Sequence, residues 1–211
     1  MKVKNSILKE IWEWIYTILI ALAIALVIKG FLFDIVLVDG SSMYPTLEHK
    51  DRLVITKLFY TPENGDIVIL DSTYKKRQAY YDNIASSKNK EELNFAEKII
   101  EGFDMPEEYK SRYYVKRVIA TPGQTVDIRD GKVYVDNMIL EEEYYSGDTF
   151  PIDASVTFPI TIEDEHVFVM GDNRHHSTDS RASSLGQVPY DAVIGQSKIR
   201  IFPLNKISLT K

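Results

Sequence analysis

Residues 113–120 read Tyr-Tyr-Val-Lys-Arg-Val-Ile-Ala, a run in which aromatic and β-branched side chains flank two basic ones. Aromatic and β-branched residues favour strands, so the run predicts a strand that is largely buried. A lysine in the middle of such a strand is unusual, because burial penalises its charged form. Neighbouring side chains of a strand point to opposite faces, so Lys116 and Arg117 need not share one environment.

Similar runs rich in valine and isoleucine recur on both sides of this stretch, with turn signals between them. Pro62–Gly65 is one such signal, and Asp130-Gly131 suits a tight hairpin because both residue types tolerate positive φ. Many short strands joined by turns predict a mainly β body. The predicted strands are residues 34–38, 52–58, 66–70, 113–119, 125–128, 132–135, 166–170 and 193–202.

Residues 72–112 differ from the rest of this body, because they are polar and rich in lysine, glutamate and tyrosine. Asn89 followed by Glu92 resembles a helix start, and Gly102 is a plausible stop. Between them, apolar residues fall on one helical face: Leu93, Ala96, Ile99, Ile100 and Phe103. We expect an inserted α-helical segment with one helix, which is either a solvated decoration or a contributor to activity.

The N-terminal part of the chain contains an uncharged apolar run at residues 15–28. Extended to residues 11–33, the run would rise about 34 Å as a helix, against a hydrocarbon core of about 30 Å. A core helix or a cleaved signal peptide are the alternatives, but no suitable cleavage site follows the run. The expectation is one N-terminal transmembrane helix at 11–33, with residues 1–10 in the cytoplasm because lysines precede the helix. Residues 34–211 would then form an extracytoplasmic β domain.

Composition excludes several classes of function. The 211 residues contain no cysteine, which rules out a disulfide framework, a thiolate metal site and a cysteine nucleophile. The formal net charge of −6 gives no electrostatic support for a nucleic-acid partner. No cofactor or metal is expected, because the adjacent His175 and His176 would point to opposite sides of an extended chain and lack a third ligand.

Three segments could carry chemistry. The first is the turn Gly40–Leu47, where a serine could present both its hydroxyl and a backbone N–H, the two groups that acyl transfer needs. The second is Lys116, which is either a base whose pKa is lowered by burial or a lysine at a strand edge. The third is the polar loop Gly171–Arg181, which follows a predicted strand. A Ser-His-Asp triad stays open from composition alone.

Taken in this order behind an N-terminal anchor, the three segments resemble the type I signal peptidases, especially those of Gram-positive bacteria. Residues 42–47 resemble the nucleophile box, residues 114–123 the lysine box and residues 171–181 a third box. Residues 51–70 resemble the strand segment between the first two boxes. The resemblance implies a serine endopeptidase that removes signal peptides from secreted preproteins at the outer face of the membrane.

The resemblance also implies roles for individual residues. Ser42 would be the nucleophile and Lys116 the general base, and Ser177 would orient the lysine. Supporting roles would fall to Asp179, Arg181, Asp172 and Arg117. The Ser42 backbone N–H would supply half of an oxyanion hole, while Gly40 lacks the hydroxyl that supplies the other half in some relatives.

Substrate recognition in that family favours small side chains before the cut, which shallow apolar pockets select. The positions here that match the pockets are Val36, Val38, Met43, Leu47, Tyr114 and Val115.

Two other classes compete with this interpretation. A self-cleaving repressor-type protease shares the serine–lysine logic, but it would require a cytosolic chain, which the apolar run at 11–33 opposes. An anchored non-catalytic β domain that binds or guides secreted proteins is the other, and the intact Ser42, Lys116 and Ser177 argue against it. Partners on the main interpretation are preproteins and the lipid bilayer.

Overall fold

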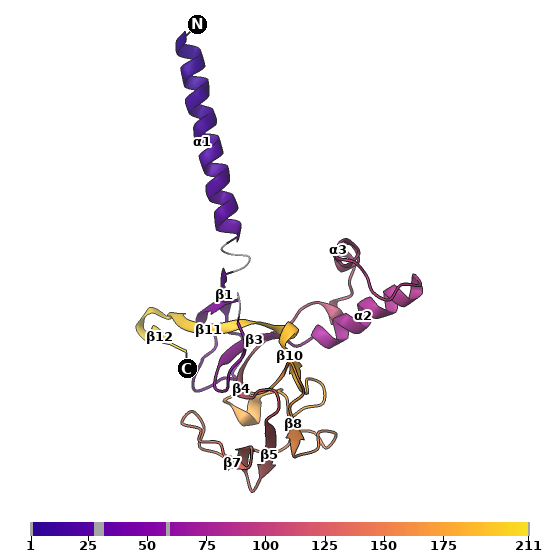
Figure 1. The fold of residues 1–211 in the computed structure, drawn as a ribbon. Coiled ribbons are helices and arrows are strands. Elements are labelled where there is room, and N and C mark those ends of the chain that lie inside the picture. Colours follow the sequence, from indigo (N-terminus) through magenta and orange to yellow (C-terminus); the bar gives the residue numbers. More distant parts are fainter. Residues whose placement is uncertain (1, 28–31, 58–59, 211) are drawn as a thin grey trace.

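The computed structural model describes residues 2–27, 32–57 and 60–210, and it is mainly β (Figure 1). Helix α1 (Lys2–Val27) stands apart from the body, and α2 (Tyr74–Ser87) and α3 (Phe95–Phe103) project from one side of it. Within the described residues, no helix combines the length and apolarity that crossing a membrane requires. Residues 28–31 of the predicted anchor lie outside the described part.

The described strands form two sheets. The larger has the order β1-β2-β11-β3-β4-β9-β10, with β12 paired to β11, and the smaller has the order β7-β6-β5-β8. The neighbours along each sheet are antiparallel. The larger sheet consists of β1 (Phe33–Leu37), β2 (Arg52–Thr56), β3 (Ile67–Asp71), β4 (Tyr113–Ala120), β9 (His166–Met170), β10 (Val188–Pro189), β11 (Val193–Phe202) and β12 (Ser208–Leu209). The smaller consists of β5 (Thr125–Arg129), β6 (Lys132–Val135), β7 (Met138–Ile139) and β8 (Ile160–Thr161).

All eight predicted strands are present, with ends shifted by two residues at most. Asp130-Gly131 forms the predicted tight turn between β5 and β6, with φ of 49° and 74°. The two-residue strands β7, β8, β10 and β12 carry no pattern long enough to be predicted.

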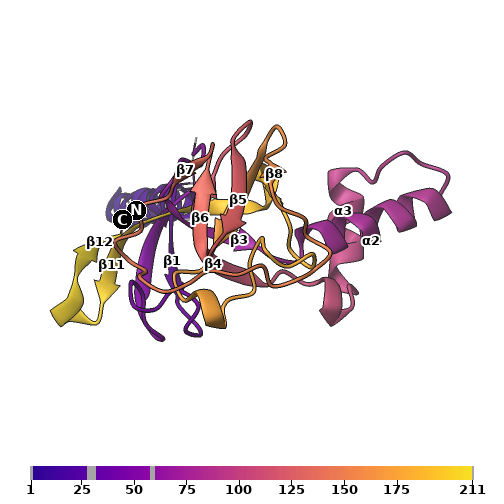
Figure 2. The same ribbon diagram turned by 90° about the horizontal axis from the view of Figure 1, so that it is seen from below.

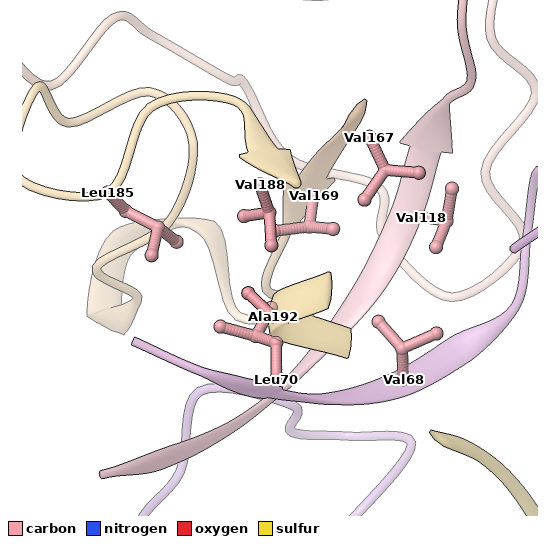
Figure 3. Packing of buried hydrophobic residues seen from close by; sticks show 8 residues of the cluster. All are labelled: Val68, Leu70, Val118, Val167, Val169, Leu185, Val188 and Ala192. Atoms are coloured by element: carbon pink, nitrogen blue, oxygen red, sulfur yellow. The ribbon is translucent and has the colours of Figure 1, made fainter. Parts of the chain in front are cut away.

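The core consists of three apolar clusters that share the central strands. The first joins β3, β4 and β9 to the segment around β10, and Figure 3 shows its side chains converging between these elements. The second lies between β4, β9 and the smaller sheet. The third packs β1, β2 and β3 against the turn after β1, including Met43 and Leu47, each 1% exposed. Strand β4 is therefore held from several sides.

The segment 72–112 contains two helices rather than the single predicted one. Helix α2 has no regular apolar stripe, which explains why periodicity missed it. Helix α3 begins later than predicted: Asn94, rather than Asn89, caps it and forms a reciprocal capping box with Glu97. Figure 2 shows both helices projecting beyond the sheets.

Candidate active site

Ser42 lies in the turn between β1 and β2, and the turn is fixed from two directions. From below, Met43 and Leu47 anchor it in the third apolar cluster. From the side, Asn173 donates its backbone N–H to the Ser42 carbonyl oxygen and its amide group to the Ser41 carbonyl oxygen, both at 3.0 Å. The loop after β9 therefore sets the position of the serine.

Gly40 enters this turn with a φ of 103°, a conformation that L side chains rarely adopt. A Cβ atom there would meet nothing within 4 Å. Backbone conformation, rather than lack of space, thus favours glycine at position 40, where the resemblance leads one to look for a hydroxyl residue.

Lys116 projects from β4 toward Ser42, and only 3% of its surface is exposed. Its Nζ atom donates hydrogen bonds to Ser42 Oγ at 2.8 Å and to the Val115 carbonyl oxygen at 3.1 Å. Burial lowers the pKa of Lys116 to about 8, against the opposing negative charges of Asp179 and Asp172. A substantial fraction of the amine is therefore neutral near physiological pH and can accept a proton.

Arg117, the next residue of β4, points to the other face of the strand, as alternation predicts. Its guanidinium makes two hydrogen bonds to the buried Asp172 carboxylate, at 2.8 and 2.7 Å, and a third to the Gly65 carbonyl oxygen. Thr46, from the serine turn, donates to the same carboxylate at 2.5 Å. The pair therefore ties β4 to the turn that carries Ser42, and neither side chain lines the cleft.

Asp179 and Arg181 form a second buried pair that shapes the loop after β9. The Asp179 carboxylate accepts hydrogen bonds from Arg181 Nε at 2.8 Å and from the Gly171 backbone N–H at 3.0 Å. The same guanidinium also donates to the Arg174 carbonyl oxygen at 2.8 Å. The loop between residues 171 and 181 is thereby closed on itself.

Ser177 lies beside the serine turn, but the expected hydrogen bond to Lys116 is not formed. Its buried Oγ atom has no hydrogen-bond partner among the described residues. A Cβ atom placed on Gly171 would lie 2.3 Å from Ser177 Oγ and 2.4 Å from the Ser42 carbonyl oxygen. The Ser177 hydroxyl and the turn that carries Ser42 thus flank Gly171, and only a glycine allows this approach.

A cleft of about 630 Å³ opens above Ser42 and Lys116, between β1 and the start of β4. Of the six predicted pocket residues, five line it: Val36, Val38, Met43, Tyr114 and Val115. Leu47 is not among the residues that line the cleft, and it packs in the third apolar cluster.

The two neighbouring histidines go to different places. His176 lines the cleft, whereas the His175 Nε2 atom lies 3.2 Å from the Tyr145 hydroxyl. Within the described residues, no group of three or more carboxylate or imidazole side chains could hold a metal ion.

Sequence reasoning assigned no role to several residues of the site. Thr46 and Asn173 stood inside the quoted boxes, but only the fold shows that one bonds Asp172 and the other holds the serine turn. Thr178 lines the cleft. A polar residue in a loop gives no indication of its hydrogen-bond partner until the loop is folded.

A serine hydroxyl hydrogen-bonded to a buried lysine amine, beside an open cleft, is the arrangement that a peptidase of the serine–lysine class requires. Residues 11–202 match the family described as signal peptidase, peptidase S26. The chain belongs to this family.

Three curated relatives are similar in sequence over nearly the whole chain. Signal peptidase I of Bacillus amyloliquefaciens is 32% identical over 95% of this chain and 90% of its own length. Signal peptidase I T of Bacillus subtilis (strain 168) is 34% identical over 94% and 89%, and signal peptidase I S of the same strain is 31% identical over the full length of both. A crystal structure of a signal peptidase I from Enterococcus faecalis V583 covers 65% of this chain and 97% of that one, at 23% identity and a TM-score of 0.41.

Proposed function

We propose that this chain removes N-terminal signal peptides from secreted preproteins, with Ser42 as the nucleophile and Lys116 as the general base. The observation that carries the assignment is the 2.8 Å contact between Lys116 Nζ and Ser42 Oγ. Burial lowers the pKa of Lys116 to about 8, which makes the amine a competent base.

The chemistry follows from these two groups. The neutral amine of Lys116 takes the proton of the Ser42 hydroxyl as Oγ attacks the scissile carbonyl carbon. The resulting ammonium then protonates the leaving amine, and the C–N bond breaks to give an acyl-enzyme. Water, deprotonated by the same lysine, then attacks the ester carbonyl. As the ester C–O bond breaks, the lysine ammonium returns its proton to Ser42 Oγ, and the signal peptide leaves with a free carboxylate. In this mechanism the Ser42 backbone N–H donates a hydrogen bond to the oxyanion.

The strand edges beside the cleft support an extended substrate. In the described part of the sheet, β1 pairs with β2 alone, and the first residues of β4, 113–116, pair with β3 alone. Each strand therefore offers one free edge toward the cleft, to which a peptide can add by main-chain hydrogen bonds. Shallow pockets beside Val36, Val38 and Tyr114 would select small side chains.

The roles proposed for the supporting residues rest on where their side chains lie. Asp172 with Arg117, and Asp179 with Arg181, hold the two loops that meet at Ser42. Ser177 supplies a hydroxyl next to Gly171, from which a small side-chain movement toward the amine would orient Lys116 during the reaction.

The proposed location is the outer face of the membrane. Residues 11–33 would anchor the chain with residues 1–10 in the cytoplasm, and residues 34–211 would form the catalytic domain, with 72–112 as an insert. Ser42 lies nine positions after Phe33, a reach of about 30 Å at most. That reach suits a cleavage site that lies just beyond a membrane-spanning signal peptide.

Cleavage of a signal-peptide substrate by Ser42→Ala and Lys116→Ala variants tests the assignment. Both should lose cleavage while keeping the far-UV spectrum of the parent chain and a cooperative unfolding transition. Undiminished cleavage by either variant overturns the mechanism. An anchored non-catalytic domain would instead show no turnover in the parent chain and no covalent labelling of Ser42 by a serine-directed inhibitor.

A further inference from the structure

Helix α3 exposes an apolar face that the rest of the described chain leaves uncovered. Phe95, Ile100 and Phe103 are 80%, 65% and 82% exposed, and Ile99 lies between them on the same face. Their spacing is that of one side of an amphipathic helix. Large apolar side chains gathered in this way mark an interaction surface rather than scattered surface residues.

The opposite face of α3 is fixed to the rest of the insert. Glu101 accepts a hydrogen bond from Lys88 at 2.7 Å, and Glu97 pairs with Lys90. On either side of the helix, Leu93 and Met105 are buried. The ion pairs and the buried flanking residues therefore hold α3 in place, and its apolar face is exposed.

The position of α3 points to the bilayer as the occupant. In Figure 1, α3 lies on the side of the body from which α1 leaves, level with the C-terminal end of α1 and close to the level of β1. An anchor that ends at this level would place α3 at the membrane surface. Helix α2 joins α3 to β3, the neighbour of the strand that carries Lys116.

The insert differs in net charge from the remainder of the chain. Residues 72–112 contain eight basic and eight acidic side chains, whereas the whole chain has a formal net charge of −6. All of the excess negative charge therefore lies outside the insert. An anionic membrane repels an acidic surface but not a neutral one with an apolar helix face.

We propose that α3 lies in the interface of the bilayer, with Phe95, Ile100 and Phe103 among the lipid headgroups and upper acyl chains. This second contact rests on the proposed anchor at 11–33, and it would fix the orientation of the cleft above the membrane. An anchor alone lets the domain rotate about one connection, whereas two contacts define its tilt.

Depth-dependent quenching in the full chain tests the proposal. Because the chain contains no cysteine, a single one can be introduced and labelled with an NBD fluorophore. Ala96→Cys places the label on the exposed face of α3 while keeping the apolar side chains, and Tyr16→Cys reports on the anchor. Met138→Cys, at a 72% exposed residue of β7 on the far side of the body, is the matched control.

Each labelled protein is reconstituted into vesicles of phosphatidylcholine and phosphatidylglycerol, with and without brominated acyl chains. We expect brominated lipid to quench the labels at 16 and 96 and to leave the label at 138 unchanged. The combined substitutions Phe95→Ser, Ile100→Ser and Phe103→Ser should abolish quenching at 96, whereas Met138→Ser with Ile139→Ser should not.

The outcomes separate the two proposals. Quenching at 16 without quenching at 96 overturns the α3 contact and keeps the anchor, while quenching at 96 alone keeps the α3 contact and removes the anchor. Energy transfer between donor- and acceptor-labelled chains at position 96, with no quenching by lipid, identifies a second copy of the chain as the occupant and also overturns the proposal.

Discussion

The guanidinium of Arg117 and the carboxylate of Asp172 meet through two hydrogen bonds of 2.8 and 2.7 Å, and both side chains are buried. The pair joins two of the sequence boxes, since Arg117 follows Lys116 in β4 and Asp172 lies at the start of the loop after β9. Removing one member leaves the other as an uncompensated buried charge or polar group.

Asp172→Asn should therefore lower the free energy of unfolding by about 3–5 kcal/mol. Urea denaturation of the full chain in detergent micelles measures the loss. Glu48→Gln serves as the control, because its partner Lys206 lies at a similar distance, 2.7 Å, but both side chains are far more exposed. That exposed pair should contribute less than about 1 kcal/mol. Equal losses in the two variants would contradict the role of burial.

The pH dependence of cleavage should report the titration of Lys116. Because only the neutral amine accepts a proton, kcat/KM should rise about tenfold per pH unit below the pKa of about 8 and level off above it. A pH–rate profile with a soluble signal-peptide substrate measures this. A profile that keeps rising to pH 10 would show that the amine is not perturbed in the free enzyme.

Burial of Lys116 should also make the free energy of unfolding depend on pH. The pKa of Lys116 is lower in the folded chain than the value of about 10.4 of a free lysine, so burial costs stability in full below pH 8. The cost fades as pH rises from about 8 to 10.4, where the unfolded chain alone holds the proton.

Lys116→Met should consequently raise the free energy of unfolding above that of the parent chain by on the order of 3 kcal/mol at pH 7. This difference should shrink toward pH 10. Denaturation of both chains at the two pH values measures the difference. An advantage that is absent at pH 7, or that grows with pH, would contradict the sign of the pKa shift.

Ser177 offers a case in which stability and activity should move apart. Its buried hydroxyl has no hydrogen-bond partner among the described residues, so Ser177→Ala removes an unpaired polar atom. We expect unchanged or slightly higher stability, because an unsatisfied buried hydroxyl costs about 1–3 kcal/mol.

If Ser177 orients the amine of Lys116 in the reaction, the same variant should lose about 10²-fold in kcat with little change in KM, and the pH profile should shift. Steady-state kinetics and the pH–rate profile provide the readouts, since a purely structural serine would move neither. Wild-type kcat in Ser177→Ala would leave the orientation of the lysine to its bond with the Val115 carbonyl oxygen.

The strands were predictable because each is a run of apolar, β-branched residues long enough to show its composition. Helix α2 was missed because Tyr74–Ser87 lacks an apolar stripe, and the start of α3 was misplaced because two asparagines precede it, each with a glutamate three residues on. Only the observed capping box selects Asn94 over Asn89.

The candidate site shows a sharper limit. Ser42 and Lys116 are 74 residues apart in sequence, and no local pattern can show that their side chains meet. The sequence pattern alone was compatible with Lys116 as a base or as a residue at a strand edge. The resemblance of the three segments to the signal peptidase boxes favoured the base. The sequence also cannot separate Leu47, which packs in the core and does not line the cleft, from Met43, which does both, because an apolar residue in a turn looks the same in either place.

Gly171 provides the last prediction, because it stands where the nucleophile turn and the third loop come closest. A Cβ atom there would lie 2.4 Å from the Ser42 carbonyl oxygen, a backbone atom that cannot move without moving the nucleophile. Gly171→Ala should therefore displace Ser42 from Lys116, and a misplacement of about 1 Å can cost 10²-fold in rate.

Gly102→Ala is the matched control for this substitution. Its Cβ atom would make an ordinary 3.7 Å contact with the Tyr81 hydroxyl, and alanine stabilises a helix by up to about 1 kcal/mol relative to glycine. Cleavage of a soluble peptide by the two variants, together with their unfolding transitions, distinguishes local displacement from general loss of fold. Full activity in Gly171→Ala would show that the serine turn can shift without consequence, and the close approach of the two loops would then have no part in catalysis.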